Sequence, residues 1–204
     1  MKIIFTTVFS LLMFLSSFVL AQPYQKYDPL KGSTLVSTIG TSTMVELNYR
    51  DQISQMIFTV KENSKEKGLA VDLISEDGKR PFYMSNNAVK NAVTMDYQSV
   101  DSLLDDRTIA WISQKVYKQL EKKGESKVST DGGKNWVVLK RKYYNYDFPV
   151  KTKAEMRNDI SYMYCETDDG AVKFWIQTGG NPLILKMDLG WATMTLKEFK
   201  MAGE

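Results

Sequence analysis

The side chains of this chain that could carry out chemistry are carboxylates standing in adjacent pairs. Asp105 and Asp106 form one pair, and Asp168 and Asp169 form the other. Two carboxylates that converge on one site could flank a glycosidic bond, and acidic clusters bind calcium. Neither stretch has the spacing of a calcium-binding loop, and paired acids are ordinary where a helix or a turn begins. A carboxylate-dependent glycan hydrolase is therefore one hypothesis.

Histidine is absent from all 204 residues, and the chain has one cysteine. Without histidine there is no Ser-His or Cys-His pair, no imidazole base and almost no way to build a catalytic zinc site. No motif supports Ser-Lys chemistry. Cys165 is expected as a buried strand residue, with an intermolecular disulfide or a reactive thiol as the functional alternatives. We predict a non-enzymatic protein with no catalytic residue, no metal ligand and no cofactor.

Residues 129–136, STDGGKNW, match the pattern Ser/Thr-x-Asp-x-Gly-x-x-Trp. This resembles the Asp-box of sialidase-like proteins, where the box lies away from the catalytic centre. We expect Asp131 to accept hydrogen bonds from backbone N–H groups ahead of it, and Gly133 to adopt a positive φ angle. Trp136 is expected to start the next strand and to be buried in the core. Ser129, Asp131, Gly133 and Trp136 are therefore predicted to form a structural turn motif.

Two weaker copies of this motif predict further hairpins. Their steps along the chain are unequal and a helix is expected between the first two copies, which argues against a propeller. Their residues are Ser75, Asp77, Gly78 and Phe82 in one copy, and Thr167, Asp169, Gly170 and Phe174 in the other.

Most of the remaining chain is typical of β-strands, rich in β-branched and large residues and separated by turn signals. Hairpin-length connections predict an antiparallel sheet. In the last stretch Ala192, Met194 and Leu196 alternate with polar residues, which indicates one buried and one solvated face. Strands are expected at 43–50, 52–61, 69–75, 135–146, 159–166, 171–177, 182–189 and 191–199.

One segment, 99–123, has helical periodicity instead. Asp105 or Asp106 could cap its start, and Gly124 suits the position just past its end. The predicted fold class is α+β, β-dominated, with an antiparallel sheet packed by one long helix near 99–123. Four apolar residues recur at the spacing of one helical face: Ile109, Ile112, Val116 and Leu120.

The stretch 171–200 contains an aromatic-rich strand ending in Trp175 and Ile176, a turn, Pro182 and Leu183, then Thr-x-x-Leu-x-Glu-Phe. In this rhythm of strands it resembles the closing strands of periplasmic lipoprotein carriers and their relatives. Those carriers curve an antiparallel sheet into a half-barrel, cover it with helices and hold acyl chains inside. The resemblance implies a curved sheet with a hollow, which we expect to be lined by Met, Phe and Trp beneath the 99–123 helix. It carries over no ligand-binding residue.

The stretch 139–148 mixes cationic residues with tyrosines, a combination typical of proteins that stack on single-stranded nucleic acid. The formal net charge of the chain is only +3, which argues against nucleic acid as a partner. A strand with one charged face is expected instead. The residues concerned are Lys140, Arg141, Lys142, Tyr143, Tyr144 and Tyr146.

The first 21 residues have the features of an export signal: Lys2, a long apolar stretch, and small residues before a cut between Ala21 and Gln22. An uncleaved membrane anchor is the alternative, because the apolar run approaches spanning length. We predict cleavage, an extended segment at 22–33, one β-rich domain at 34–204 with no membrane span, and a periplasmic or extracellular location.

These observations predict an exported binding or carrier domain for an apolar ligand or an envelope protein. The alternative is a structural or partner-interaction protein with a filled core, and the glycan hydrolase is third. Lipid or an envelope protein is the expected partner and nucleic acid is not. The oligomeric state stays open.

Overall fold

The computed structural model describes residues 35–64, 66–96, 103–179 and 182–203. The predicted signal sequence, its cut between Ala21 and Gln22, and the segment 22–33 lie outside these ranges. Within them, no helix is long and apolar enough to cross a membrane.

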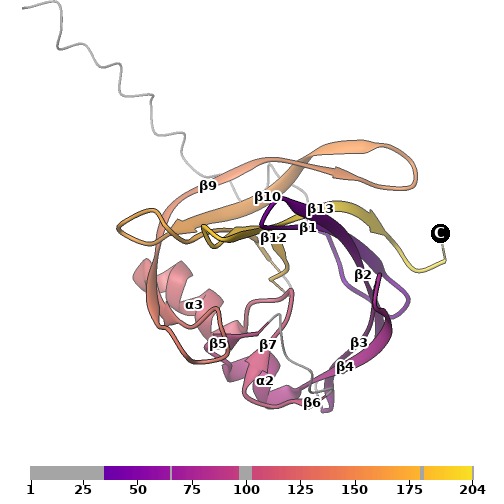
Figure 1. Ribbon diagram of the computed structural model, residues 1–204, viewed down its shortest axis with the longest axis horizontal. Helices are drawn as coiled ribbons and strands as arrows, with labels where there is room; N and C mark the ends of the chain where they lie inside the picture. The colour runs from indigo at the N-terminus through magenta and orange to yellow at the C-terminus, as the bar shows by residue number, and fades with distance from the viewer. Residues whose placement is uncertain (1–34, 65, 97–102, 180–181, 204) are drawn as a thin grey trace, which may run out of the picture.

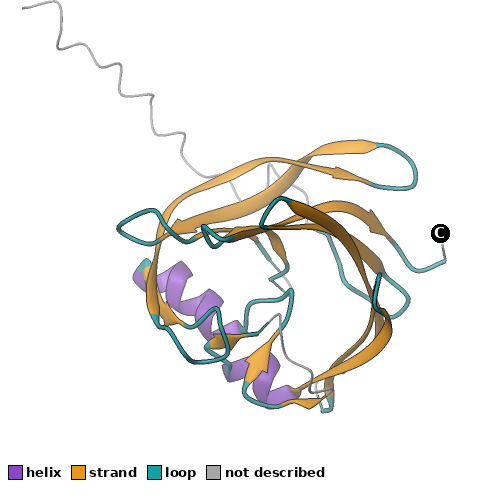
Figure 2. Cartoon of the chain, viewed as in Figure 1, coloured by secondary structure: helices purple, strands orange, loops and turns teal. Residues whose placement is uncertain are grey.

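Eleven strands form one curved sheet in the order β6-β4-β3-β2-β1-β13-β12-β11-β10-β9-β8, with β6 and β8 at its two ends (Figures 1 and 2). All neighbours along this order are antiparallel except the short parallel pair of β4 and β6. The predicted β-dominated α+β class with a curved antiparallel sheet is confirmed. Its strands are β1 Ser42–Tyr49, β2 Gln52–Ser64, β3 Gly68–Ser75, β4 Gly78–Ser85, β6 Leu103–Leu104, β8 Glu125–Val128, β9 Val137–Lys151, β10 Met156–Glu166, β11 Lys173–Gln177, β12 Ile184–Asp188 and β13 Ala192–Lys200. A separate small sheet pairs β5 Thr94–Met95 with β7 Arg107–Thr108.

The two faces of the large sheet differ because successive side chains of a strand point to opposite sides. Val45 of β1 lies opposite Met56 of β2 and Leu196 of β13, so these three side chains share a face. Two residues further along β2, Phe58 packs edge to face on Trp111, with ring centroids 6.2 Å apart. We call this side, which packs against the chain between β7 and α3, the inner face.

Two helices, α2 Asn86–Asn91 and α3 Gln114–Lys123, lie between the two ends of the sheet (Figure 1). Helix α3 contacts β8 and β9, α2 contacts β3 and β4, and the two helices contact each other. Helix α2 has no counterpart among the helices expected from the sequence, although Ser85 is a normal cap whose hydroxyl accepts a hydrogen bond from the Ala88 N–H.

The prediction of one long helix near 99–123 is wrong over residues 103–113, and residues 99–102 lie outside the described ranges. Helix α3 begins at Gln114, because the hydroxyl of Ser113 accepts the hydrogen bond of the Val116 N–H at 3.3 Å. Asp105 and Asp106 therefore do not cap it. Its end is as predicted, since Gly124 has a φ of 79° and its N–H donates to the Leu120 carbonyl.

The residues 109–112, which suggested the first turns of that helix, form a non-helical segment that we call the inner segment. Its backbone pairs with the start of β12: the Ile112 N–H donates to the Pro182 carbonyl, and the Ile184 N–H donates to the Ala110 carbonyl, both at 2.9 Å. Ala110 has a φ of 60°, which a right-handed helix does not allow. All four residues are at most 4% exposed, so the segment lacks the alternation of buried and exposed faces that a surface helix shows.

Candidate functional site

The Asp-box residues form a tight local network. The Ser129 hydroxyl donates to Asp131 Oδ1 and accepts from the Gly133 N–H, both at 2.9 Å. Asp131 Oδ1 also accepts from the Asn135 N–H at 2.8 Å, and Oδ2 accepts from the Asn135 side-chain amide at 2.6 Å. Gly133 has a φ of 94°. The structure therefore brings Ser129, Asp131 and Gly133 together as a pinned turn.

Trp136 does not join this network, and the prediction that it is buried in the core is wrong. Its side chain is 45% exposed, and the Lys127 ammonium lies 5.6 Å from its ring centroid. In the two weaker copies the aromatic is buried, with Phe82 4% exposed and Phe174 fully buried. The copy that matches the pattern best is thus the one whose aromatic residue stays outside.

The turn is anchored to the small sheet by backbone hydrogen bonds to Met95. The Met95 N–H donates to the Ser129 carbonyl at 2.8 Å, and the Gly132 N–H donates to the Met95 carbonyl at 3.1 Å. Next along the chain, Asp96 accepts from Arg107 Nη1 at 3.0 Å. These contacts position a loop, and no described group of His, Cys, Asp or Glu side chains could hold a metal ion.

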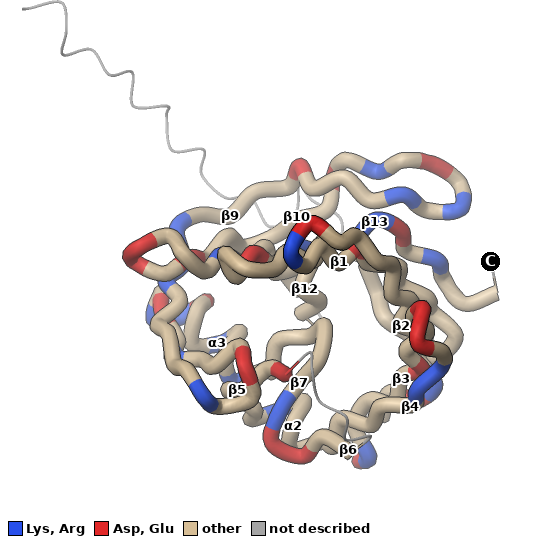
Figure 3. The backbone as a smooth tube through the Cα atoms, viewed as in Figure 1, with Lys and Arg blue, Asp and Glu red and all other residues tan. Residues whose placement is uncertain are grey.

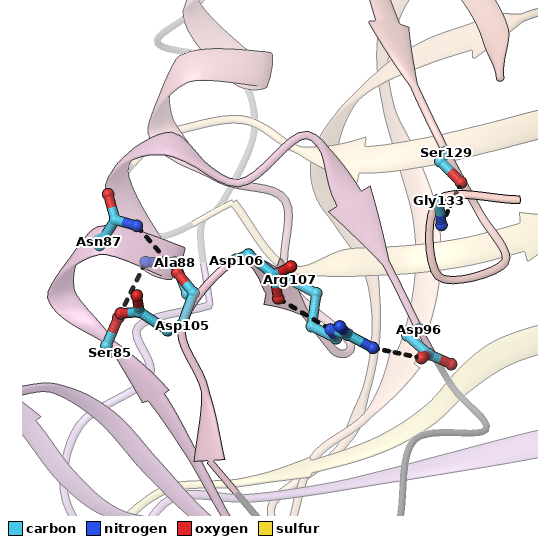
Figure 4. Close-up of polar contacts among 9 residues, drawn as sticks. All are labelled: Ser85, Asn87, Ala88, Asp96, Asp105, Asp106, Arg107, Ser129 and Gly133. Carbon is cyan, nitrogen blue, oxygen red and sulfur yellow. Dashed lines mark hydrogen bonds and ion pairs between the residues drawn. The ribbon is translucent and has the colours of Figure 1, made fainter. Parts of the chain in front are cut away.

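Each of the four paired acids is engaged in a local contact, and the structure does not bring the two pairs together. Asp105 accepts from the Ser85 hydroxyl, and Asp106 accepts from Arg107 Nε at 2.9 Å (Figure 4). In the second pair, which lies between β10 and β11, Asp168 accepts from Lys140 Nζ at 2.7 Å. The remaining acid, Asp169, accepts from the Thr167 hydroxyl at 2.5 Å and from the Ala171 N–H at 3.0 Å.

Cys165 is fully buried in β10, as predicted. Burial raises the pKa of its thiol to about 12, because the charged thiolate is poorly solvated there. The thiolate is the reactive form, so the pKa shift opposes the reactive-thiol alternative.

The basic and aromatic stretch lies in β9, where its rings stack on protein groups. Tyr143 stacks on Tyr164 with centroids 4.9 Å apart, and Tyr164 lies at the same distance from Trp175. The Arg141 guanidinium lies 5.1 Å from the centroid of Tyr144. Acidic and basic residues are interspersed along the described chain (Figure 3). Both observations fit a structural strand with a mixed, charged surface.

Removing the Asp131 carboxylate should lower stability in a pH-dependent way. Hydrogen bonds, chiefly from the Asn135 backbone N–H, hold the pKa of Asp131 below its usual range. The stabilisation is therefore complete above the unfolded-state pKa, about 4, and is lost as pH falls through the lower folded-state pKa. We expect Asp131→Ala to lower the free energy of unfolding by about 1 kcal/mol at neutral pH. The loss is small because water can replace these exposed hydrogen bonds.

Urea midpoints from pH 7 down to pH 2 measure this effect. The matched control is Asp77→Ala, because Asp77 occupies the same motif position but makes no side-chain hydrogen bond with another described residue. The control should leave the midpoint near that of the wild type. A deficit of Asp131→Ala that persists unchanged at the lowest pH would contradict the role of the carboxylate.

A hollow of about 680 Å³ opens on the inner face, at the end of the sheet where the hairpins β1–β2, β3–β4 and β12–β13 turn. Drug-sized ligands occupy pockets of about 300–1,000 Å³. Six of its apolar lining residues come from five strands and one turn. The residues are Leu47, Met56, Leu73, Phe82, Met187 and Leu189.

The mouth of this hollow is bordered by aromatic and aliphatic side chains. Tyr49 and Trp191 pack edge to face with centroids 5.8 Å apart. Trp191 is 49% exposed and Ile53 is 64% exposed. Single exposed apolar residues are normal, but here they adjoin an open apolar space.

The hollow contains the expected residue types but lies in a different place from the one expected. Met56, Phe82, Met187 and Trp191 line it, whereas no residue of α2 or α3 does. A space of about 10 Å³, enough for a single water, lies between α2, α3 and Trp111. The inner segment fills that end of the inner face, whereas the described residues leave the hairpin end uncovered.

Comparisons with protein-family models, with curated proteins and with solved structures found no match to this chain.

Proposed function

We propose that this protein binds an apolar ligand in the hollow at the hairpin end of its sheet and acts as a carrier rather than an enzyme. The observation that carries the proposal is the open space of about 680 Å³ with its apolar lining. Burying a ligand there removes apolar surface from water on both partners, which favours binding. The local contacts of the paired acids and the resemblance to lipoprotein carriers support the same role.

The alternative, a protein that binds a partner through a free strand edge, has weaker support. Strand β4 pairs with β6 only at Tyr83 and Met84, so its N-terminal part has an open edge among the described residues. Pro81 stands in that part and has no N–H to donate. Proline on an edge strand is a device that prevents strand addition.

Filling the hollow should weaken binding. We expect Leu73→Trp to weaken binding of the apolar fluorescent probe N-phenyl-1-naphthylamine by at least about tenfold, because the larger side chain occupies the ligand space. The matched control is Ile74→Trp, since Ile74 is the next residue, on the opposite face, and is 41% exposed. The control should bind the probe as the wild type does.

Titrations of the probe, with urea midpoints to show that both variants are folded, test the proposal. Absence of probe binding by the wild type, or equal binding by both folded variants, would overturn it. Native mass spectrometry of protein gently extracted from its own envelope should also show adducts of an apolar ligand.

A further inference from the structure

Arg80 is the one arginine of the described chain whose side chain has no partner. The chain has five arginines. Arg107, Arg141 and Arg157 donate hydrogen bonds to acidic or carbonyl oxygens, and Arg50 lies over the Tyr49 ring. Arg80 makes no side-chain hydrogen bond, ion pair or ring contact with another described residue.

This unpartnered cation lies on the inner face, in the lining of the hollow. The register pairs Arg80 of β4 with Leu73 of β3, and Leu73 with Phe58 of β2, so the three side chains point to the same side. Phe82, two residues further along β4, lines the hollow too. An exposed guanidinium therefore stands on the inner face beside the apolar side chains of Leu73 and Phe82.

The groups around Arg80 leave its hydrogen-bonding capacity unused. Glu76 and Asp77, on the β3–β4 turn, line the same hollow, yet neither forms an ion pair with it. Ser54 and Gln52 of β2 supply further polar groups on the inner face. The adjacent cation, Lys79, instead points to the opposite face, where its ammonium lies 2.8 Å from Asp72.

We propose that the ligand is an anionic amphiphile, whose apolar chain fills the hollow and whose carboxylate or phosphate head binds Arg80. This inference rests on the proposed function, since it assigns the head group of the same ligand. A guanidinium offers two parallel N–H donors that match a carboxylate or phosphate, and such charge-assisted hydrogen bonds are the strong ones. Carboxylate and phosphate share this chemistry.

The test compares ligands with one apolar chain and different heads: dodecanoate, dodecyl phosphate, dodecan-1-ol and dodecyltrimethylammonium. Each is titrated below its micelle-forming concentration against the protein loaded with N-phenyl-1-naphthylamine. We expect the wild type to bind at least one anion about tenfold more tightly than the alcohol, and the cation most weakly. Arg80→Gln should remove this preference while the affinity for the alcohol stays unchanged.

Two further variants make the test specific. Arg80→Lys keeps the charge but not the paired donors, so it should retain part of the preference for anions. Lys79→Gln removes the neighbouring cation on the opposite face and should behave as the wild type. The tighter of the two anions identifies the head group.

Each other outcome overturns a different statement. If the alcohol binds as tightly as both anions, or if Arg80→Gln keeps the preference, the anionic head is wrong while the carrier function stands. If neither the probe nor any amphiphile binds the folded wild type, the hollow is not a ligand site and both proposals fail.

Discussion

Replacing Gly68 by alanine is expected to destabilise the protein by at least about 4 kcal/mol, among the largest effects of a single substitution. Gly68, at the start of β3, has a φ of 112°. A Cβ atom there would lie 2.2 Å from the Met84 carbonyl oxygen and 2.6 Å from the Ser85 carbonyl carbon. Both are backbone atoms at the junction of β4 and α2, so no side-chain rotation relieves the overlap.

Gly78→Ala separates this overlap from backbone strain. Gly78 has nearly the same φ, 109°, but a Cβ atom there would meet nothing within 4 Å. The free energy of unfolding of Gly78→Ala should therefore fall only by the strain energy of a positive φ, about 1–3 kcal/mol. Urea midpoints and slopes for both variants measure the difference. Equal losses would show that β4 and α2 yield to the added methyl group.

The second large effect is expected at Phe174. It is fully buried in β11, and the register places it opposite Cys165 of β10 and Met187 of β12. Phe174→Ala should therefore leave a cavity and lower the free energy of unfolding by about 3–5 kcal/mol. The measurement is the same urea titration.

Trp136→Ala is the matched comparison, because both aromatics occupy the same position of their motif copies. Trp136 is 45% exposed and close to Lys127, so its removal should lower stability by less than about 1 kcal/mol. A larger loss for Trp136→Ala than for Phe174→Ala would contradict this view of the two hairpins.

Features that depend on neighbouring residues could be predicted from the sequence. Most strands, the end of α3 at Gly124 and the Asp131 turn fall where they were expected. The side-chain hydrogen bonds within that turn join residues at most four positions apart, so a short pattern contains all of them.

Features that depend on distant residues could not be predicted. The inner segment has helical spacing, yet its hydrogen bonds go to residues near 183, because pairing with β12 satisfies the backbone in place of a helix. Trp136 and Phe174 are equivalent in the motif. Phe174 lies between strands on both sides, however, whereas Trp136 precedes β9 beside the last strand of the sheet.

The sequence by itself determined that this is a β-rich chain without histidine chemistry, whose strands have alternating faces. Only the tertiary structure decided that Trp111 and its neighbours cover one end of the inner face, while the part of the chain that the structure describes leaves the hairpin end with Arg80 open. Alternation assigns each side chain to a face. Whether that face is then covered depends on segments far away in the sequence, which no local period encodes.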